Sequence, residues 1–386
     1  MLSLIKNLRK ELHQYPELSG KEIQTAQRLK TFIAKHNPTR IVDNLGGHGL
    51  AAIYEFAKKG PAVMIRCELD ALPITENNDF IHQSVTPGIA HKCGHDGHMA
   101  IVAGLVLWIK KQRFSAGKII LLFQPAEETG QGAFNVLQDR SFEAMRPDYI
   151  FALHNIPGEQ LHKIIWTPKG FSATVQSVIV HLKGKQCHAS EPENGINPAL
   201  GISEIIQAFS GLNEAKQSSD NFAILTPIHI NMGQKSYGVS AGIGEIHYTL
   251  RTWSTDYMHQ LKDKINTLLA GICKKHRLTF TTDWLEYFPA AVNNSLCNDL
   301  VKKAADHNNF ELLERDFPFK FGEDFGWFAQ KYPAAMFGVG AGIKSPALHH
   351  SDYDFPEELI PTGMRMFQSI ISRILPNHKE ESTIDG

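Results

Sequence analysis

Residues 91–98 bring together side chains that could bind a metal ion. Within eight positions the sequence has one thiol, three imidazoles and one carboxylate, and two glycines let the backbone turn tightly. Cys93 and His95 are the natural ligand pair, because thiolate and imidazole suit Zn²⁺ or a neighbouring transition metal. A polar turn with one or two buried histidines is the alternative, and for a single histidine it would be preferred. The crowding of donors favours a metal site.

An apolar run, residues 99–109, follows these donors directly. A run of this length and composition predicts a buried helix. The donors would then lie at the N-terminal end of the helix, where the helix dipole favours a thiolate at Cys93.

Polar side chains also follow three segments that predict buried strands: residues 61–66, 118–123 and 149–153. These side chains are Glu68 and Asp70, Glu127 and Glu128, and His154 and Asn155. Ligand sites in open α/β sheets lie at the carboxyl ends of strands, so we expect these groups to converge on one crevice.

Glu127 and Glu128 are adjacent carboxylates after a buried strand. Neighbours on an extended backbone point in opposite directions, so one can bind a metal while the other acts as general base on a water molecule. A solvated acidic loop is the alternative, but Phe123 and the nearby glycines favour an interior loop. Taken singly, His154 and His349 would be core or surface histidines, yet both follow apolar, strand-like segments.

The length of 386 residues exceeds one ordinary core and predicts two domains. A net charge of -1 gives no reason to expect nucleic acid or an anionic membrane as partner. We find no apolar run of the roughly 18 residues that a membrane span needs. The first 20 residues predict an amphipathic helix and lack the features of a signal peptide.

The five cysteines are scattered along the chain, which argues for reduced thiols in a cytosol-like compartment. We expect Cys67, Cys273 and Cys297 to be packing residues. The expected location is therefore the cytoplasm.

The pattern changes from about residue 171. A strand (178–182), a helix (198–209), two strands (222–232 and 246–253), a second helix (258–273) and a short strand (278–282) are expected in turn. This β-α-β-β-α-β order is typical of the split βαβ arrangement and indicates a second domain inserted into the first. Helix–strand alternation then resumes, with a buried strand at 333–339. The expected domains are a first catalytic part (1–172), an inserted lid and dimerisation domain (173–285) and a second catalytic part (286–386).

Six blocks of sequence resemble one enzyme family. They are residues 15–19 (YPELS), 68–74 (ELDALPI), 93–98 (CGHDGH), 124–132 (QPAEETGQG), 153–155 (LHN) and 348–350 (LHH). The resemblance is to the metallo-amidohydrolases that include hippurate hydrolase, auxin-conjugate hydrolases and bacterial N-acyl amino acid deacylases, subfamily D of peptidase family M20. It implies an α/β fold: a mixed-sheet catalytic domain of the di-metal aminopeptidase type with an inserted ferredoxin-like α+β lid and dimerisation domain.

The resemblance also implies a two-metal centre. The implied ligands are Cys93, His95, Glu128, His154 and His349, with His350 as the alternative for the last position. Glu127 would be the general base, and Asp70 would orient a ligand. The two divalent ions could be Zn, Mn, Co or Ni.

The inserted domain carries two further candidates. Residues 184–190 resemble the family's lid motif, in which a histidine, here His188, stabilises the tetrahedral oxyanion, in cis or across a dimer. Arg251 matches the lid arginine, a plausible clamp for a carboxylate. Departures from the family pattern at residues 237–240, Glu68 and residues 321–325 affect mainly the expected lid contacts and substrate choice.

The expected activity is hydrolysis of the amide bond of N-acyl amino acids (acetyl, benzoyl or similar) to a carboxylic acid and a free amino acid. The partners would be this small substrate and a second copy of the chain, in a homodimer or larger homo-oligomer. A dipeptidase or carboxypeptidase of the same fold is one alternative. A non-catalytic metal-binding scaffold is another, but a closed structural site needs four ligands and no spare base.

Overall fold

The computed structural model describes residues 2–376, which form two compact units. Unit 1 comprises Met1–Phe171, Ala291–Asp316 and Asp324–Gly386 within this described part, and unit 2 comprises Ser172–Ala290 and Phe317–Glu323. The last expected segment, 286–386, runs into residues 377–386, which lie outside the described residues.

Unit 1 is built on a mixed eight-stranded sheet. In pairing order the strands are β1 (Arg40–Leu45), β2 (Gly49–Glu55), β4 (Ala116–Gln124), β3 (Lys58–Glu68), β5 (Tyr149–Ile156), β14 (Ala334–Gly340), β6 (Ile164–Trp166) and β13 (Leu312–Glu314). The four central strands β4, β3, β5 and β14 are parallel, whereas β1, β2 and the β14–β6 pair are antiparallel. The carboxyl ends of the central strands therefore meet at one edge.

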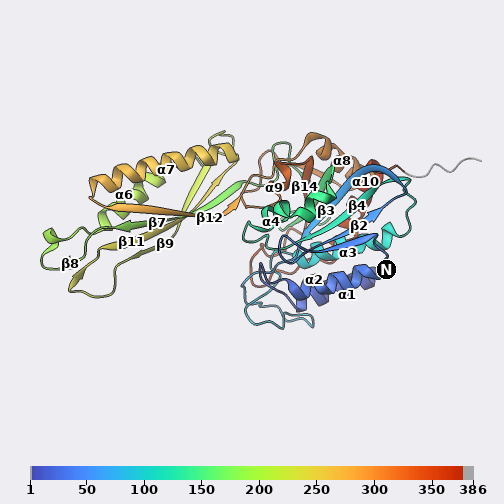
Figure 1. Cartoon of the computed structure of the whole chain (residues 1–386), viewed down its shortest axis with the longest axis horizontal. Coiled ribbons are helices and arrows are strands. Elements are labelled where there is room, and N and C mark those ends of the chain that lie inside the picture. The colour runs from blue at the N-terminus through green and yellow to red at the C-terminus, as the bar shows by residue number, and fades with distance from the viewer. Residues whose placement is uncertain (1, 377–386) are drawn as a thin grey trace, which may run out of the picture. The chain divides into compact units, whose positions relative to one another are not determined.

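Helices cover both faces of this sheet, which explains why its central strands are apolar on both sides. One face packs against α1 (Leu2–Gln14), α2 (Ile23–Ala34), α3 (His95–Ile109), α8 (Ser295–His307) and α10 (Leu359–Ile374). Figure 1 shows α1, α2 and α3 side by side. The other face contacts α4 (Gly132–Gln138), α5 (Arg140–Met145) and α9 (Gly326–Ala329).

The helix α3 confirms the buried helix expected after the donor-rich segment. Every residue from 95 to 106 is buried, as is Ile109. Gly97 lies where α3 packs against Phe355, and a Cβ at this position would overlap the Phe355 ring. The first turn of α3 is thus held close to the segment that follows His349.

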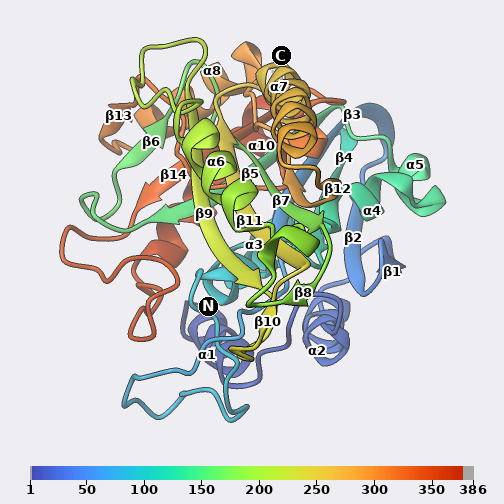
Figure 2. The same ribbon diagram turned by 90° about the vertical axis from the view of Figure 1, so that its left-hand side faces the viewer.

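Unit 2 is a four-stranded antiparallel sheet covered on one face by two helices (Figures 1 and 2). The strands pair in the order β12 (Thr279–Phe288), β7 (Thr174–Lys183), β11 (Ile243–Thr252) and β9 (Ala223–Met232). The helices are α6 (Ala199–Ser210) and α7 (Thr255–Lys275), and a short ribbon pairs β8 (Cys187–His188) with β10 (Val239–Ser240). The main strands and helices follow the expected β-α-β-β-α-β order, but β12 is longer than the expected strand 278–282.

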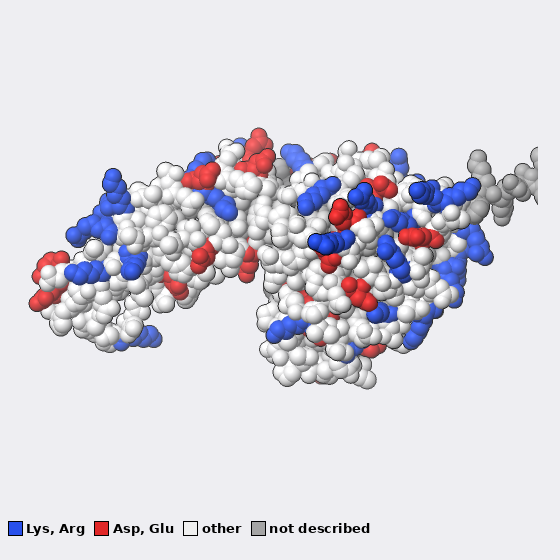
Figure 3. Space-filling view, in the orientation of Figure 1, with Lys and Arg blue, Asp and Glu red and all other residues white. Residues whose placement is uncertain are grey.

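Charged side chains of both signs are interspersed on the face seen in Figure 3. This distribution agrees with the near balance of 39 basic and 40 acidic residues in the sequence. Among the described residues, no helix has the length and apolar character needed to cross a membrane.

Replacing Gly97 by alanine tests the close packing of α3. Because the added methyl group meets the Phe355 ring, Gly97→Ala is expected to lower the free energy of unfolding by about 1–3 kcal/mol. Gly271→Ala is the matched control in α7: its methyl group would meet no atom within 4 Å, so it should raise that free energy by about 0.5–1 kcal/mol. Urea unfolding followed by circular dichroism measures both, and equal stabilisation by the two variants would contradict the packing argument.

Candidate metal centre

The candidate metal centre lies at the carboxyl ends of parallel strands in unit 1. Because β4, β3 and β5 are neighbours with the same direction, the segments that follow them meet at one edge of the sheet. The N-terminal end of α3 reaches this edge, where His95 Nδ1 lies 2.8 Å from the carbonyl oxygen of Asp70. The expected convergence of these segments is confirmed.

A glycine allows the thiol of Cys93 to approach the other donors. Gly94 has a left-handed backbone (φ 98°), and a Cβ there would lie 2.5 Å from Oδ1 of Asn155. Asn155 Nδ2 in turn donates to the carbonyl oxygen of Cys93 at 3.1 Å and to the Tyr353 hydroxyl at 2.6 Å. These contacts hold the Cys93 backbone against the end of β5.

Two imidazole rings are held by backbone carbonyl groups. The Nδ1 atom of His95 can donate to the carbonyl of Asp70, and that of His154 to the carbonyl of Asn155, each at 2.8 Å. In this arrangement Nδ1 of each ring faces the backbone and Nε2 is directed toward the other donors, as in histidines that bind metals. The Nε2 atom of His154 lies 3.5 Å from Sγ of Cys93.

Six side chains of unit 1 form overlapping groups of possible metal donors. Within each group, one donor atom per residue lies within 4.8 Å of the others. The groups are Cys93 with His95 and His154, Cys93 with Glu128 and His349, and His95 with Glu127 and Glu128. All five side chains expected to bind metal therefore lie together with the expected general base.

His349, rather than its neighbour His350, belongs to these groups. Its Nε2 lies 3.7 Å from Oε1 of Glu128, and its backbone N–H donates to the carbonyl of Lys92 at 2.8 Å. The backbone of His349 is left-handed (φ 65°), a conformation that non-glycine residues rarely adopt and that costs of order 1–3 kcal/mol. His350 belongs to none of the donor groups found among the described residues.

The backbone of the glutamate pair differs from the expectation. Glu127 and Glu128 lie in a turn rather than on an extended chain: Ala126 has φ 53°, and the N–H of Gly130 donates to the carbonyl of Glu127 at 2.8 Å. The turn has a physical cause, because Glu22 accepts a hydrogen bond from the Ala126 N–H at 2.8 Å. Both carboxylates nevertheless reach the donor groups.

Asp70 contacts two of the expected ligands. Its Oδ2 accepts hydrogen bonds from the Glu128 N–H at 2.9 Å and from the Ser19 hydroxyl at 2.7 Å, and its Oδ1 lies 3.6 Å from Nδ1 of His95. Burial would raise the pKa of Asp70, but the contact with His95 and these hydrogen bonds lower it. An ionised Asp70 therefore braces the backbone of Glu128 and the ring of His95.

The protonation of Cys93 corrects one expectation. Burial, reinforced by the nearby Glu128 carboxylate, raises the pKa of the Cys93 thiol well above its usual value. Burial thus outweighs the effect of the helix dipole. Without a bound cation, the thiol form of Cys93 is favoured over the thiolate. Burial likewise lowers the pKa of His154 to about 3, which keeps this ring neutral.

These features fit a divalent cation. Thiol, imidazole and carboxylate side chains are the ligand types that Zn²⁺ and its neighbours take, and a cation would stabilise the thiolate that burial disfavours. Among the described residues, the buried Nε2 of His95 has no hydrogen-bond partner, although it lies 3.9 Å from Oε1 of Glu128. A buried ring nitrogen without a hydrogen-bond partner is suited to bind a metal ion.

A buried network beside the donors was missed by the sequence analysis, which placed Glu68 at the end of a strand and noted it as a departure from the family pattern but did not predict its partners. Glu68 pairs with Arg66 and lies 2.7 Å from Nδ1 of His98, whose Nε2 is 2.5 Å from Asn155. Arg66 also donates to Asp324 at 2.6 Å. The only local sign of this network in the sequence is that charged residues, Arg66 and Glu68, occupy alternate positions at the end of an otherwise apolar strand.

Glu68, His95 and His98 also form a group of possible donors. Because both ring nitrogens of His98 already lie within hydrogen-bond distance of Glu68 and Asn155, we interpret this group as a hydrogen-bonded support.

His188 and Arg251 belong to unit 2. His188 is exposed, and its Nδ1 lies 2.6 Å from the Ser190 hydroxyl. Arg251 is partly buried, which lowers its pKa, and its guanidinium donates to the carbonyl of Lys320 at 2.6 Å. The roles expected of both residues stay predictions.

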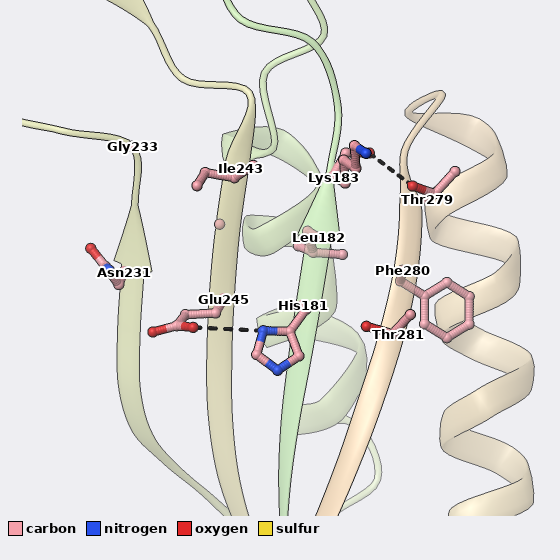
Figure 4. A pocket seen from close by; sticks show the side chains of 11 residues that line it. His181, Leu182, Lys183, Asn231, Gly233, Ile243, Glu245, Thr279, Phe280 and Thr281 are labelled. Atoms are coloured by element: carbon pink, nitrogen blue, oxygen red, sulfur yellow. Dashed lines mark hydrogen bonds and ion pairs between the residues drawn. The ribbon is translucent and has the colours of Figure 1, made fainter.

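A separate hollow of about 430 Å³ lies on the sheet of unit 2 (Figure 4). Within it the ring of His181 faces the carboxylate of Glu245 at 3.6 Å. In the described part of the chain, every group of three or more metal donors includes a residue of unit 1, so this hollow offers no competing metal centre.

Known proteins resemble this chain over nearly its whole length. N-acetyl-L-cysteine deacetylase from Bacillus subtilis (strain 168) is 30% identical over 381 residues, which cover 98% of this chain and 90% of that protein. N-acetyldiaminopimelate deacetylase from Brevibacillus brevis is 28% identical, over 94% of this chain and 96% of that protein.

Solved structures share the fold. A Bacillus subtilis protein described as a dinuclear metal binding peptidase from the M20 family has a TM-score of 0.81 and 24% identity, over 96% of this chain and 97% of that one. A putative aminohydrolase from methicillin-resistant Staphylococcus aureus has a TM-score of 0.86 and 24% identity, over 96% of each chain. Residues 64–373 match the sequence profile of peptidase family M20/M25/M40, and the chain therefore belongs to this family.

Proposed function

We propose that the protein is a metal-dependent amidohydrolase that cleaves N-acyl amino acids to a carboxylic acid and a free amino acid. The observation that carries this proposal is a buried carboxylate, Glu127, beside five other side chains that lie together as possible metal donors. A structural metal site has no use for such a spare base. The relatives named as deacetylases of N-acetyl-L-cysteine and N-acetyldiaminopimelate support acetyl as the first acyl group to test.

We assign the metal-binding role to five side chains: Cys93, His95, Glu128, His154 and His349. Two divalent cations, when bound, lower the pKa of water and polarise the substrate carbonyl. Thiol and imidazole donors favour Zn, while the carboxylates leave Mn, Co and Ni as candidates. Asp70 keeps Glu128 and His95 oriented through the contacts described above.

Glu127 is the proposed general base. Its side chain is buried, with 6% exposed, and one of its oxygens accepts a hydrogen bond from the Asp324 N–H at 3.3 Å. This hydrogen bond holds the carboxylate beside the donors. Glu127 would take a proton from the attacking water and then deliver it to the amide nitrogen, which must be protonated to leave as an amine.

Unit 2, which contains the expected segment 173–285, is proposed to act as an inserted lid and dimerisation domain. His188 would donate a hydrogen bond to the oxyanion, an interaction typically worth about 3 kcal/mol. Arg251 would bind the carboxylate of the amino acid, since its planar guanidinium suits a bidentate contact. The exposure of the His188 side chain supports a role in which a second subunit receives it.

The proposed activity is tested with a panel of N-acetyl amino acids, N-benzoyl amino acids and dipeptides. The purified protein is expected to hydrolyse N-acyl amino acids faster than dipeptides, to lose activity with EDTA, and to regain it with added Zn²⁺, Mn²⁺, Co²⁺ or Ni²⁺. Faster hydrolysis of dipeptides would favour a dipeptidase, and activity that survives metal removal would contradict the proposed chemistry.

Removing single histidines tests the ligand set. His154→Ala and His349→Ala should each lower the metal content after dialysis, because each removes a donor from the groups described above. His350→Ala is the matched control, since it removes an exposed imidazole outside these groups and should retain the full metal content. Elemental analysis measures the content, and equal loading of the His349 and His350 variants would contradict the assignment.

Glu127→Gln separates metal binding from catalysis. The substitution keeps the size of the side chain but removes the base, so kcat should fall by about 10²–10⁴-fold while the metal content is unchanged. Steady-state kinetics and elemental analysis on the same sample measure both. A variant that keeps normal kcat would rule out Glu127 as the base.

Mixing two inactive variants tests whether His188 acts across a dimer. If each site uses Glu127 of one subunit and His188 of the other, reassembled dimers of Glu127→Ala and His188→Ala subunits should contain one intact site. Some activity should then return. Absence of recovery after demonstrated subunit exchange would instead favour action of His188 in cis.

A further inference from the structure

Six charged side chains of alternating sign form a row beside the N-terminal end of α3; five are buried, and the sixth, Asp354, is partly exposed. This row, called here the charge chain, consists of Lys92, Glu76, His13, Asp96, Arg9 and Asp354. It joins residues that are distant in the sequence: His13 and Asp96 lie 83 positions apart, and Arg9 and Asp354 lie 345 positions apart. All six belong to unit 1, yet they come from α1, the segment before Cys93, the first turn of α3 and the segment after His349.

His13 is the centre of the charge chain. Its Nε2 lies 2.9 Å from Oε1 of Glu76, and its Nδ1 lies 2.8 Å from Oδ2 of Asp96. Because a carboxylate only accepts hydrogen bonds, both ring nitrogens must donate, and the ring is an imidazolium. Burial would lower the pKa of His13, but Asp96 and Glu76 outweigh it and raise that pKa. The chain then holds three cations and three anions.

The ends of the charge chain are equally well paired. Lys92 Nζ lies 2.5 Å from Oε1 of Glu76 and donates to the backbone carbonyl of Tyr353 at 2.8 Å. Arg9 Nε lies 2.7 Å from Oδ2 of Asp96, and its Nη2 pairs with Asp354. The chain therefore closes back on the same segment, 353–354, from both ends.

Burial makes the members of the chain depend on one another. The side chains of Arg9, His13, Lys92 and Asp96 have 0% of their surface exposed. A buried charge is tolerated only when it is paired and hydrogen-bonded, and removal of one partner leaves the others with unpaired charge. A change at His13 is thus transmitted to Glu76 and Asp96 on either side.

Members of the charge chain lie on both sides of the expected metal ligands. The ion pairs of the chain do not include the side chains of those ligands. Lys92 and Asp96 flank Cys93 and His95 in the sequence. The carbonyl of Lys92 also accepts the hydrogen bond from the backbone of His349. The positions of three expected ligands therefore depend on residues whose own positions are set by the chain.

We propose that the charge chain, centred on His13 and Arg9 of α1, preorganises Cys93, His95 and His349 for metal binding. His13 and Arg9 are positioning residues, because they act through Asp96 and Lys92. The inference rests on the proposed metal centre and adds to it a requirement for α1, a helix that contributes no ligand.

The test is the affinity of the metal-free protein for Zn²⁺, measured by competition with a chromophoric chelator. Polar partners that orient metal ligands typically change metal affinity by 10–100-fold when removed, so His13→Leu and Arg9→Met should each weaken Zn²⁺ binding by about 10-fold or more. Arg9→Lys keeps the positive charge and should recover part of the loss. His13→Gln, which keeps polar groups and a similar size, serves as a second variant if His13→Leu does not fold.

Val301→Ala is the control for lost stability. Val301 is a fully buried residue of α8 outside the charge chain, so its truncation destabilises unit 1 through a cavity alone. All measurements are made well below the lowest melting temperature of the variants. The control should bind Zn²⁺ with an affinity within about 2-fold of that of the unsubstituted protein. If Val301→Ala weakened Zn²⁺ binding as much as His13→Leu, the loss of affinity would be explained by lower stability, and the inference would be overturned.

The remaining outcomes separate this inference from the proposed function. Unchanged Zn²⁺ affinity in the His13 and Arg9 variants overturns the inference and leaves the proposed activity standing. Weakened binding in a protein that hydrolyses no N-acyl amino acid supports the inference and contradicts the proposed activity. An unsubstituted protein that binds no Zn²⁺, Mn²⁺, Co²⁺ or Ni²⁺ contradicts both.

Discussion

The need to pair every charge that is removed from water governs the structure around the N-terminal end of α3. Arg66, Glu68, Asp96 and Arg9 all lie in the interior of unit 1, and each is placed against a partner of opposite sign. Unpaired, any of them would be strongly unfavourable. Paired, they constrain the segments that carry them, because an ion pair in a dry interior tolerates little displacement. The same constraint acts on the donors of the metal centre.

The donor groups bring acids, a thiol and imidazoles close together. Glu127 and Glu128 bring two carboxylates beside a thiol whose pKa burial has raised. The two buried imidazoles differ: burial lowers the pKa of His154 to about 3, whereas contacts with Cys93 and Asp70 outweigh burial and raise the pKa of His95 well above its usual value. A bound divalent cation would stabilise the thiolate form of Cys93 that burial disfavours.

The two units contribute different kinds of residues to the proposed function. Unit 1 provides all the expected ligands and Glu127 from the ends of parallel strands and from α3, which is a rigid setting. Unit 2 provides His188 within the two-stranded ribbon of β8 and β10 and Arg251 near the end of β11. Catalytic geometry and substrate contacts would then be set by separate cores, each with its own packed helices. Under this proposal, variation in unit 2 would change substrate choice without disturbing the donors.

By itself the sequence determined the elements around the centre and the residues that converge there. Apolar runs identified α3, β3, β4 and β5, and polar residues at their ends indicated candidate donors, because periodicity is a local property. The particular set of ligands came from the resemblance to a family. Tertiary structure alone decided the turn at Ala126, the raised pKa of Cys93 and the pairing of His13 with Asp96. These depend on burial and on partners distant in the chain: whether a charged residue is solvated or enclosed is settled only when other segments pack around it.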